Sequence, residues 1–136
     1  MLFRSACDGA LLPDVDEALR CLAQQLALHV VTADTFGTAR EALAGIPCQL
    51  AILPPGHQDS AKLRYVENLG AARCACIGNG RNDRLMLAAA GLGIAVVQGE
   101  GAAVETVLAA RVVVPDIQVA LGLLLHPERL VATLRA

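Results

Sequence analysis

The chain has 136 residues, a length typical of one domain and sufficient to bury a sizeable core. Hydrophobic residues make up 55% of it but aromatic residues only 2%, so we expect a core of alanine, valine, leucine and isoleucine, as in buried parallel strands. The formal net charge of −2 argues against an electrostatic nucleic-acid binder, which needs a basic surface.

The apolar runs are too short for a membrane protein. The longest, residues 85–97, contains two glycines and falls short of the roughly 18 residues that a membrane-spanning helix needs. The N-terminus also lacks the charged and then apolar plan of a signal peptide. We therefore expect a cytoplasmic protein without membrane contact.

Strands and helices are predicted to alternate after an irregular start. Apolar residues at helical spacing predict a first helix from Asp14 to about residue 27. The expected strands then cover residues 28–32, 47–53, 74–77, 93–97 and 112–114. The expected helices cover residues 38–44, 59–69, 83–90, 102–109 and 117–125, with a last amphipathic turn or two after Pro127. This alternation predicts one α/β domain over residues 1–136, with a three-layer, mostly parallel sheet.

The most informative stretch is residues 77–83, Ile-Gly-Asn-Gly-Arg-Asn-Asp. It has the pattern of a strand end, a glycine turn and a helix whose N-cap is Asn82 or Asp83. Asn79, Asn82 and Asp83 would then lie at the carboxyl end of a strand, where open α/β sheets bind ligands. Their oxygens suit Mg²⁺, although a well-capped turn without a ligand would have the same pattern.

This stretch, with Leu-Met-Leu-Ala-Ala-Ala-Gly-Leu-Gly-Ile-Ala-Val at residues 85–96, resembles the last motif of the haloacid dehalogenase superfamily. It is most similar to the soluble proteins related to the phosphorylation domain of P-type ATPases, where Gly-Asp-Gly-x-Asn-Asp is usual. The likeness extends over residues 6–135. It implies a Rossmann-like fold without a large cap, and Mg²⁺-dependent hydrolysis of phosphate esters or phosphoanhydrides.

The resemblance also implies roles for two residues upstream of the motif. Val-Thr-Ala-Asp-Thr-Phe-Gly-Thr-Ala, residues 31–39, matches the segment in which a threonine binds the transferring phosphoryl oxygens, so Thr32 and the backbone amide of Ala33 would bind phosphate. Lys62, the chain's only lysine, stands where the family has its phosphate-neutralising lysine. The alternatives are a turn-forming threonine and a solvated helix lysine.

At the last motif, the resemblance implies that Asn79 and Asp83 hold Mg²⁺ directly or through water, while Asn82 braces the loop. The metal would neutralise charge that develops on the phosphoryl group. Thr32 and Lys62 would be the catalytic residues.

The family's aspartate nucleophile has no counterpart in either alignment of the N-terminus. In one alignment, Asp8 keeps the acid/base position and Ala6 takes the place of the nucleophile. In the other, which matches more residues, residues 6–13 follow the motif and the nucleophile would precede Met1. We then expect the strand before the motif, the central one of this fold, to be mostly missing or degenerate.

Three function classes follow from these expectations. The first is a phosphohydrolase that is impaired or inactive because its nucleophile is missing. The second is a non-catalytic binding or regulatory module, or a subunit completed by a partner's strand; a homo-oligomer formed through an exposed sheet edge would favour it. The third is a receiver-like domain. It is the least favoured, because Pro54 and Pro55 stand where a receiver has its phospho-acceptor aspartate. The expected partner is a small phosphorylated substrate or phosphate.

Overall fold

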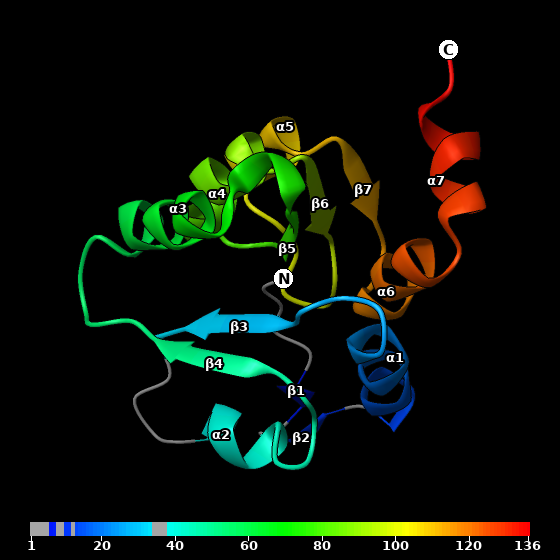
Figure 1. Cartoon of the computed structure of the whole chain (residues 1–136). Helices are drawn as coiled ribbons and strands as arrows, with labels where there is room; N and C mark the ends of the chain where they lie inside the picture. The colour runs from blue at the N-terminus through cyan, green and yellow to red at the C-terminus, as the bar shows by residue number, and fades with distance from the viewer. Residues whose placement is uncertain (1–5, 8–9, 12, 34–37) are drawn as a thin grey trace.

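The computed structural model describes residues 6–7, 10–11, 13–33 and 38–136. Strands and helices alternate through most of this part of the chain (Figure 1). The strands are β1 (Ala6–Cys7), β2 (Ala10–Leu11), β3 (His29–Thr32), β4 (Gln49–Ile52), β5 (Ala75–Gly78), β6 (Leu92–Val96) and β7 (Val112–Val114). The helices are α1 (Pro13–Ala23), α2 (Thr38–Ala42), α3 (Gln58–Leu69), α4 (Arg84–Ala89), α5 (Val104–Ala109), α6 (Ile117–Leu125) and α7 (Pro127–Leu134), with short 3-10 helices η1 (Ala71–Arg73) and η2 (Arg81–Asp83).

The described strands form two separate parallel sheets. β3 pairs with β4, and β5, β6 and β7 pair in that order. Within the described residues, no strand pairing joins β3 to β5. β1 and β2 form a short antiparallel hairpin in the region predicted to be irregular. The prediction of a mostly parallel α/β fold is confirmed, with an interruption in strand pairing between the two parallel sheets within the described residues.

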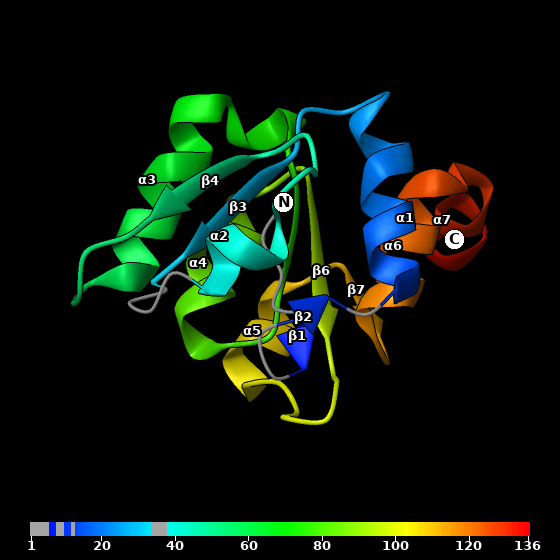
Figure 2. The same ribbon diagram turned by 90° about the horizontal axis from the view of Figure 1, so that it is seen from below.

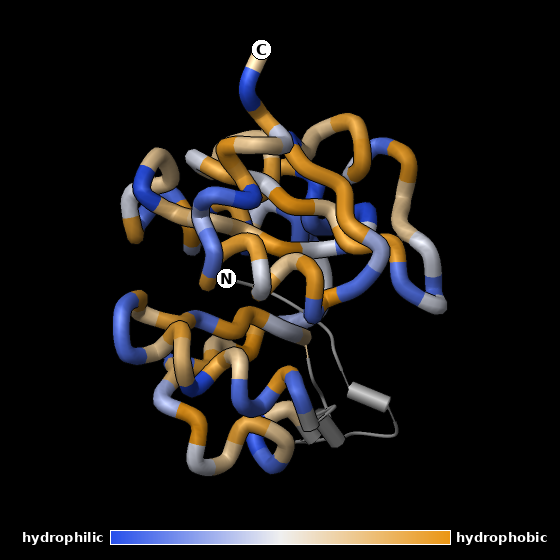
Figure 3. The backbone as a smooth tube through the Cα atoms, turned by 90° about the vertical axis from the view of Figure 1, so that its right-hand side faces the viewer, coloured by the Kyte–Doolittle hydropathy of each residue, from blue (hydrophilic) through white to orange (hydrophobic). Residues whose placement is uncertain are grey.

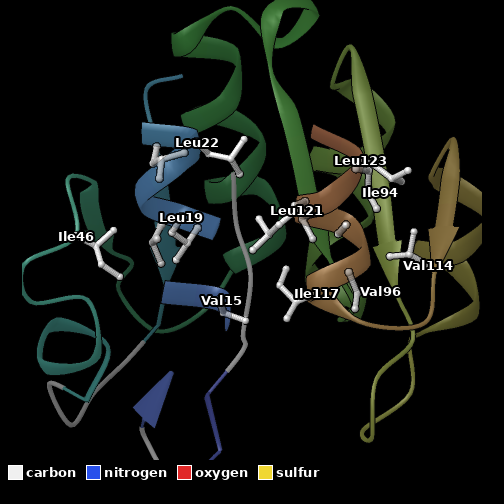
Figure 4. Close-up of a cluster of buried hydrophobic side chains, with 14 of the residues drawn as sticks. Val15, Leu19, Leu22, Ile46, Ile94, Val96, Val114, Ile117, Leu121 and Leu123 are labelled. Atoms are coloured by element: carbon white, nitrogen blue, oxygen red, sulfur yellow. The ribbon is translucent and has the colours of Figure 1, made fainter. Parts of the chain in front are cut away.

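Side chains pack across this interruption on both faces of the sheets. On one face, Val30 of β3 and Ile77 of β5 belong to one buried cluster with residues of α1 and α6. Figure 4 shows part of this cluster, including Leu19 of α1 and Leu121 of α6. On the other face, Val31 and Cys76 belong to a second cluster, which includes residues of α3 and α4. Figure 2 shows the resulting layers, with α1 and α6 on one side and α3 and α4 on the other. The two sheets therefore pack as one layer, although no backbone hydrogen bonds between described strands join them.

Local sequence accounts for several element boundaries. α1 starts at Pro13, a residue favoured in the first turn, but ends at Ala23, four residues before the predicted end. α3 ends at Gly70, whose φ of 93° is in the left-handed region that glycine tolerates. β7 and α6 have the predicted bounds, and Asp116 caps α6 by accepting a hydrogen bond from the Val119 amide.

Buried apolar residues lie on strands β3, β5, β6 and β7 and on helices α1, α4 and α6. Figure 3 shows apolar and polar residues intermixed along the backbone. Among the described residues, no single helix has the length and apolar composition needed to cross a membrane. The consecutive helices α6 and α7 reach that length only as a pair, and they are bent by 103°.

Candidate functional site

The candidate site is the loop that follows β5, where Gly78 leads into η2. A β-carbon on Gly78 would lie 2.5 Å from both the Cγ and the Oδ2 atoms of Asp83. No other residue would leave space for the Asp83 carboxylate, which folds back against the end of the strand. The glycine is therefore required by close approach, since its φ is not in the left-handed region.

Asp83 organises this loop by accepting hydrogen bonds from residues on both sides of the site. Its Oδ2 atom accepts from the backbone amides of Asn79 at 3.0 Å and Gly80 at 2.9 Å. Its Oδ1 atom accepts from the ammonium of Lys62 at 2.7 Å. The prediction that Asn82 or Asp83 stands at the N-cap of the following helix is confirmed in position, since Asp83 directly precedes α4, but its side chain makes no cap hydrogen bond to α4 and instead binds the turn behind it.

Lys62 approaches Asp83 from α3 and is buried with it. The Lys62 and Asp83 side chains are only 7% and 4% exposed. The Lys62 ammonium also donates to Oδ1 of Asn82 at 3.1 Å, so two of its three hydrogens have acceptors. The third has no partner among the described residues. The alternative of a solvated helix lysine is therefore wrong.

The first turn of α3 is held to the loop by a second set of polar contacts. Asn82 donates from Nδ2 to Oε1 of Gln58 at 2.9 Å, and Arg84 donates to Oδ2 of Asp59 at 3.0 Å. Hydrogen bonds from the Ser60 amide and from Arg84 lower the pKa of Asp59. No role for Gln58, Asp59 or Arg84 could be predicted from the sequence, because their partners lie 24 or 25 residues away along the chain.

The opposite side of the loop is held by the segment between β6 and α5. The Asn79 side chain donates from Nδ2 to the carbonyl oxygen of Gly101 at 3.2 Å. The backbone carbonyl oxygen of Asn79 accepts from the Ala103 amide at 2.9 Å. Thr106, which is fully buried, donates its hydroxyl to the Gly80 carbonyl oxygen at 2.7 Å. Sequence reasoning missed Thr106, and a polar residue within an apolar helix was the only signal for it.

Thr32 is the last residue of β3 and Ala33 follows it; among the described residues, neither forms a hydrogen bond or ion pair with Lys62 or Asp83. β3 begins at His29, whose Nδ1 atom lies 2.7 Å from the hydroxyl of Tyr65 in the second half of α3. Because α3 returns antiparallel to the strands, Thr32 lies at the edge of the sheet where α3 begins. Its hydroxyl has no partner among the described residues. Asp8 and Asp34 lie outside the described residues.

The oxygen ligands available at the loop do not form the coordination set of a tight Mg²⁺ site. Mg²⁺ prefers carboxylate oxygens in near-octahedral geometry, but the carboxylate of Asp83 already has an ammonium and two amides bound to it. Asn79 adds only a neutral amide. No cluster of three or more metal-ligating side chains occurs in the part of the chain that the structure describes.

Comparison with known protein sequences identifies a relative of this chain. No family model matches the chain. An uncharacterized protein from Methanocaldococcus jannaschii is 45% identical over 84 residues, which cover 59% of this chain and 90% of that protein.

Two solved structures share the arrangement of strands and helices. One is 3-deoxy-D-manno-octulosonate 8-phosphate phosphatase from Moraxella catarrhalis, in complex with Mg²⁺, phosphate and its sugar-acid molecule; its TM-score is 0.72 at 17% identity, covering 93% of this chain and 78% of that one. The other is the catalytic domain of the CPx-ATPase CopB-B, with a TM-score of 0.64 at 22% identity, covering 82% of this chain and 44% of that one.

Proposed function

Because the chain belongs to the same family as the Methanocaldococcus jannaschii protein and has the haloacid dehalogenase fold, we propose that it binds the phosphoryl group of a small phosphorylated molecule. The main support is the buried Lys62–Asp83 pair at the end of β5. Such a pair is costly to bury. Among the described residues, the third ammonium hydrogen of Lys62 has no acceptor, and we propose that it donates to a phosphoryl oxygen.

Each residue of the proposed site has a separate task. Lys62 neutralises charge on the phosphoryl group, and Asp83 with Asn82 fixes the direction of its ammonium. The Thr32 hydroxyl and the Ala33 amide bind further oxygens from the end of β3.

Arg84 and Asp59 hold the first turn of α3 against the loop. These contacts bind and orient a phosphoryl group, but they supply no nucleophile.

Turnover of phosphate esters is proposed to be slow or absent. An aspartyl-phosphate intermediate needs an aspartate nucleophile, and neither alignment of residues 1–13 provides one. Removing the nucleophile from such a catalytic unit typically costs about 10⁴-fold or more in rate. A small residual rate is compatible with binding and electrostatic stabilisation alone. Mg²⁺, which the Moraxella catarrhalis phosphatase holds, is proposed to bind weakly here.

The test is calorimetric titration with inorganic phosphate, in parallel with an assay of p-nitrophenyl phosphate hydrolysis. We expect saturable phosphate binding, little or no hydrolysis, and loss of binding in Lys62→Gln. Arg64→Gln is the matched control, because Arg64 is an exposed cation on the same helix. Rapid hydrolysis by this chain would contradict the proposed lack of a nucleophile, and absent phosphate binding would contradict the proposed site.

A second candidate is a subunit completed by a partner's strand, and the lack of strand pairing between β3 and β5 among the described residues favours it. Both strands are buried on both faces, so their backbone groups need hydrogen-bond partners. A second copy of the chain could pair with them. Light scattering during size-exclusion chromatography tests this candidate: a dimer at micromolar concentration would support it, and a monomer would contradict self-association.

A further inference from the structure

The Asp83 carboxylate already has a cation bound to it. The ammonium of Lys62 lies 2.7 Å from Oδ1, and both side chains are more than nine-tenths buried. The Oδ2 atom accepts from two backbone amides. A divalent ion at Oδ1 would have to displace this ammonium or share the oxygen with it, and two cations so close in a buried site repel each other strongly.

The rest of the described loop offers little to a metal ion. Asn79 is neutral, and its amide donates to the Gly101 carbonyl. Asp59, the nearest other carboxylate of the network, is paired with Arg84 at 3.0 Å. Mg²⁺ releases its waters reluctantly. One carboxylate that is already bound to Lys62 and one neutral amide are too few ligands to compensate for the loss of those waters.

We propose that Lys62 serves as the cation of this site, so that a phosphate-type oxyanion binds without a divalent metal ion. This inference rests on the proposed function. The third ammonium hydrogen of Lys62 is without a partner among the described residues, and so is the Thr32 hydroxyl at the same edge of the sheet. Together they provide donors for the oxygens of the anion, while Asp83 and Asn82 keep the ammonium in place.

The main experiment measures the dissociation constant of inorganic phosphate in millimolar Mg²⁺ and in EDTA at matched ionic strength. Coupling between two ligands is reciprocal, and typical coupling changes an affinity by about fivefold or more. We expect the two constants to agree within about fivefold. Larger tightening by Mg²⁺ would overturn this inference but leave the proposed function intact, whereas absent binding in both buffers would refute the proposed function itself.

A variant tests whether Lys62 is what excludes the metal. In Lys62→Gln, which keeps an amide donor towards Asp83, the carboxylate has lost its cation. We expect millimolar Mg²⁺ to raise the melting temperature of this variant but not that of the wild type or of Arg64→Gln. The role of Lys62 would be contradicted if Mg²⁺ left the melting temperature of Lys62→Gln unchanged, or if it raised the melting temperature of the wild type by the same amount. If Lys62→Gln does not fold, Lys62→Met at reduced temperature replaces it.

Discussion

At the scale of single residues, the Asp83 carboxylate accepts three hydrogen bonds, two from backbone amides of its own loop and one from Lys62. An aspartate before a helix usually accepts hydrogen bonds from the helix that follows. Here Asp83 accepts from the backbone amides of Asn79 and Gly80, earlier in the same loop, and from Lys62 on α3. The carboxylate thus joins the end of β5 to α3, and this one residue determines both the shape of the loop and the position of the buried cation.

Gly78→Ala tests how much the loop depends on this close approach. The added methyl group would lie 2.5 Å from Asp83, which is held by three hydrogen bonds and cannot move freely. We expect a loss of about 1–3 kcal/mol in the free energy of unfolding, as for other overpacked sites, together with weaker phosphate binding. Gly99→Ala is the control, since nothing lies within 4 Å of its β-carbon position. Equal stability of the two variants in urea would refute this account.

His29 predicts a dependence of stability on pH. Burial lowers the pKa of His29 below its ordinary value of 6.5, so the unfolded chain takes up a proton more readily than the folded one. This contribution to stability is fully present above about pH 6.5 and is lost as the pH falls towards the pKa of the folded state.

Urea unfolding at about pH 7.5 and about pH 5 measures this dependence. We expect the wild type to be less stable at the lower pH and His29→Gln to show a smaller difference between the two. His126→Gln, at an exposed position, should behave like the wild type. A pH dependence that is unchanged in His29→Gln would assign the effect to other groups.

At the scale of elements, α1 and α6 together cover one face of the sheets. Leu121 of α6 is fully buried and belongs to the same cluster as Leu19 of α1 (Figure 4). We expect Leu121→Ala to cost about 2–5 kcal/mol, because it removes contacts and leaves a cavity. Leu108→Ala on α5 is the control: Leu108 is 80% exposed, so its loss should change the unfolding free energy by less than about 0.5 kcal/mol. Similar costs for the two would contradict the assignment of this core.

The elements themselves could be predicted because their signals are local. The apolar run of β7 and the Asp116 cap of α6 are each visible within a few residues of sequence. The Lys62–Asp83 pair could be anticipated only through the family resemblance. The contacts of Gln58, Arg84 and Thr106 could not, because their partners are 24 to 26 residues away and depend on how α3, η2 and α5 pack.

At the scale of the whole molecule, two parallel sheets share one pair of buried clusters, and the candidate site lies at one edge of this layer. α3 contributes Lys62, and η2, which follows β5, contributes Asp83, while β3 contributes Thr32 from the other sheet. Phosphate bound between them would connect the two sheets at the place where no described strand pairing does. The claim that these two edges form one site is therefore central to the proposed function.

The most direct measurement is a titration of the ¹⁵N-labelled protein with inorganic phosphate, followed by amide chemical shifts, with sodium chloride at matched ionic strength as the control. We predict that the saturable shifts concentrate at Thr32 and Ala33, at the first turns of α3, and at residues 78–83. Shifts confined to one sheet would contradict a shared site. Shifts elsewhere on the molecule, or none, would contradict phosphate recognition by Lys62 and Asp83.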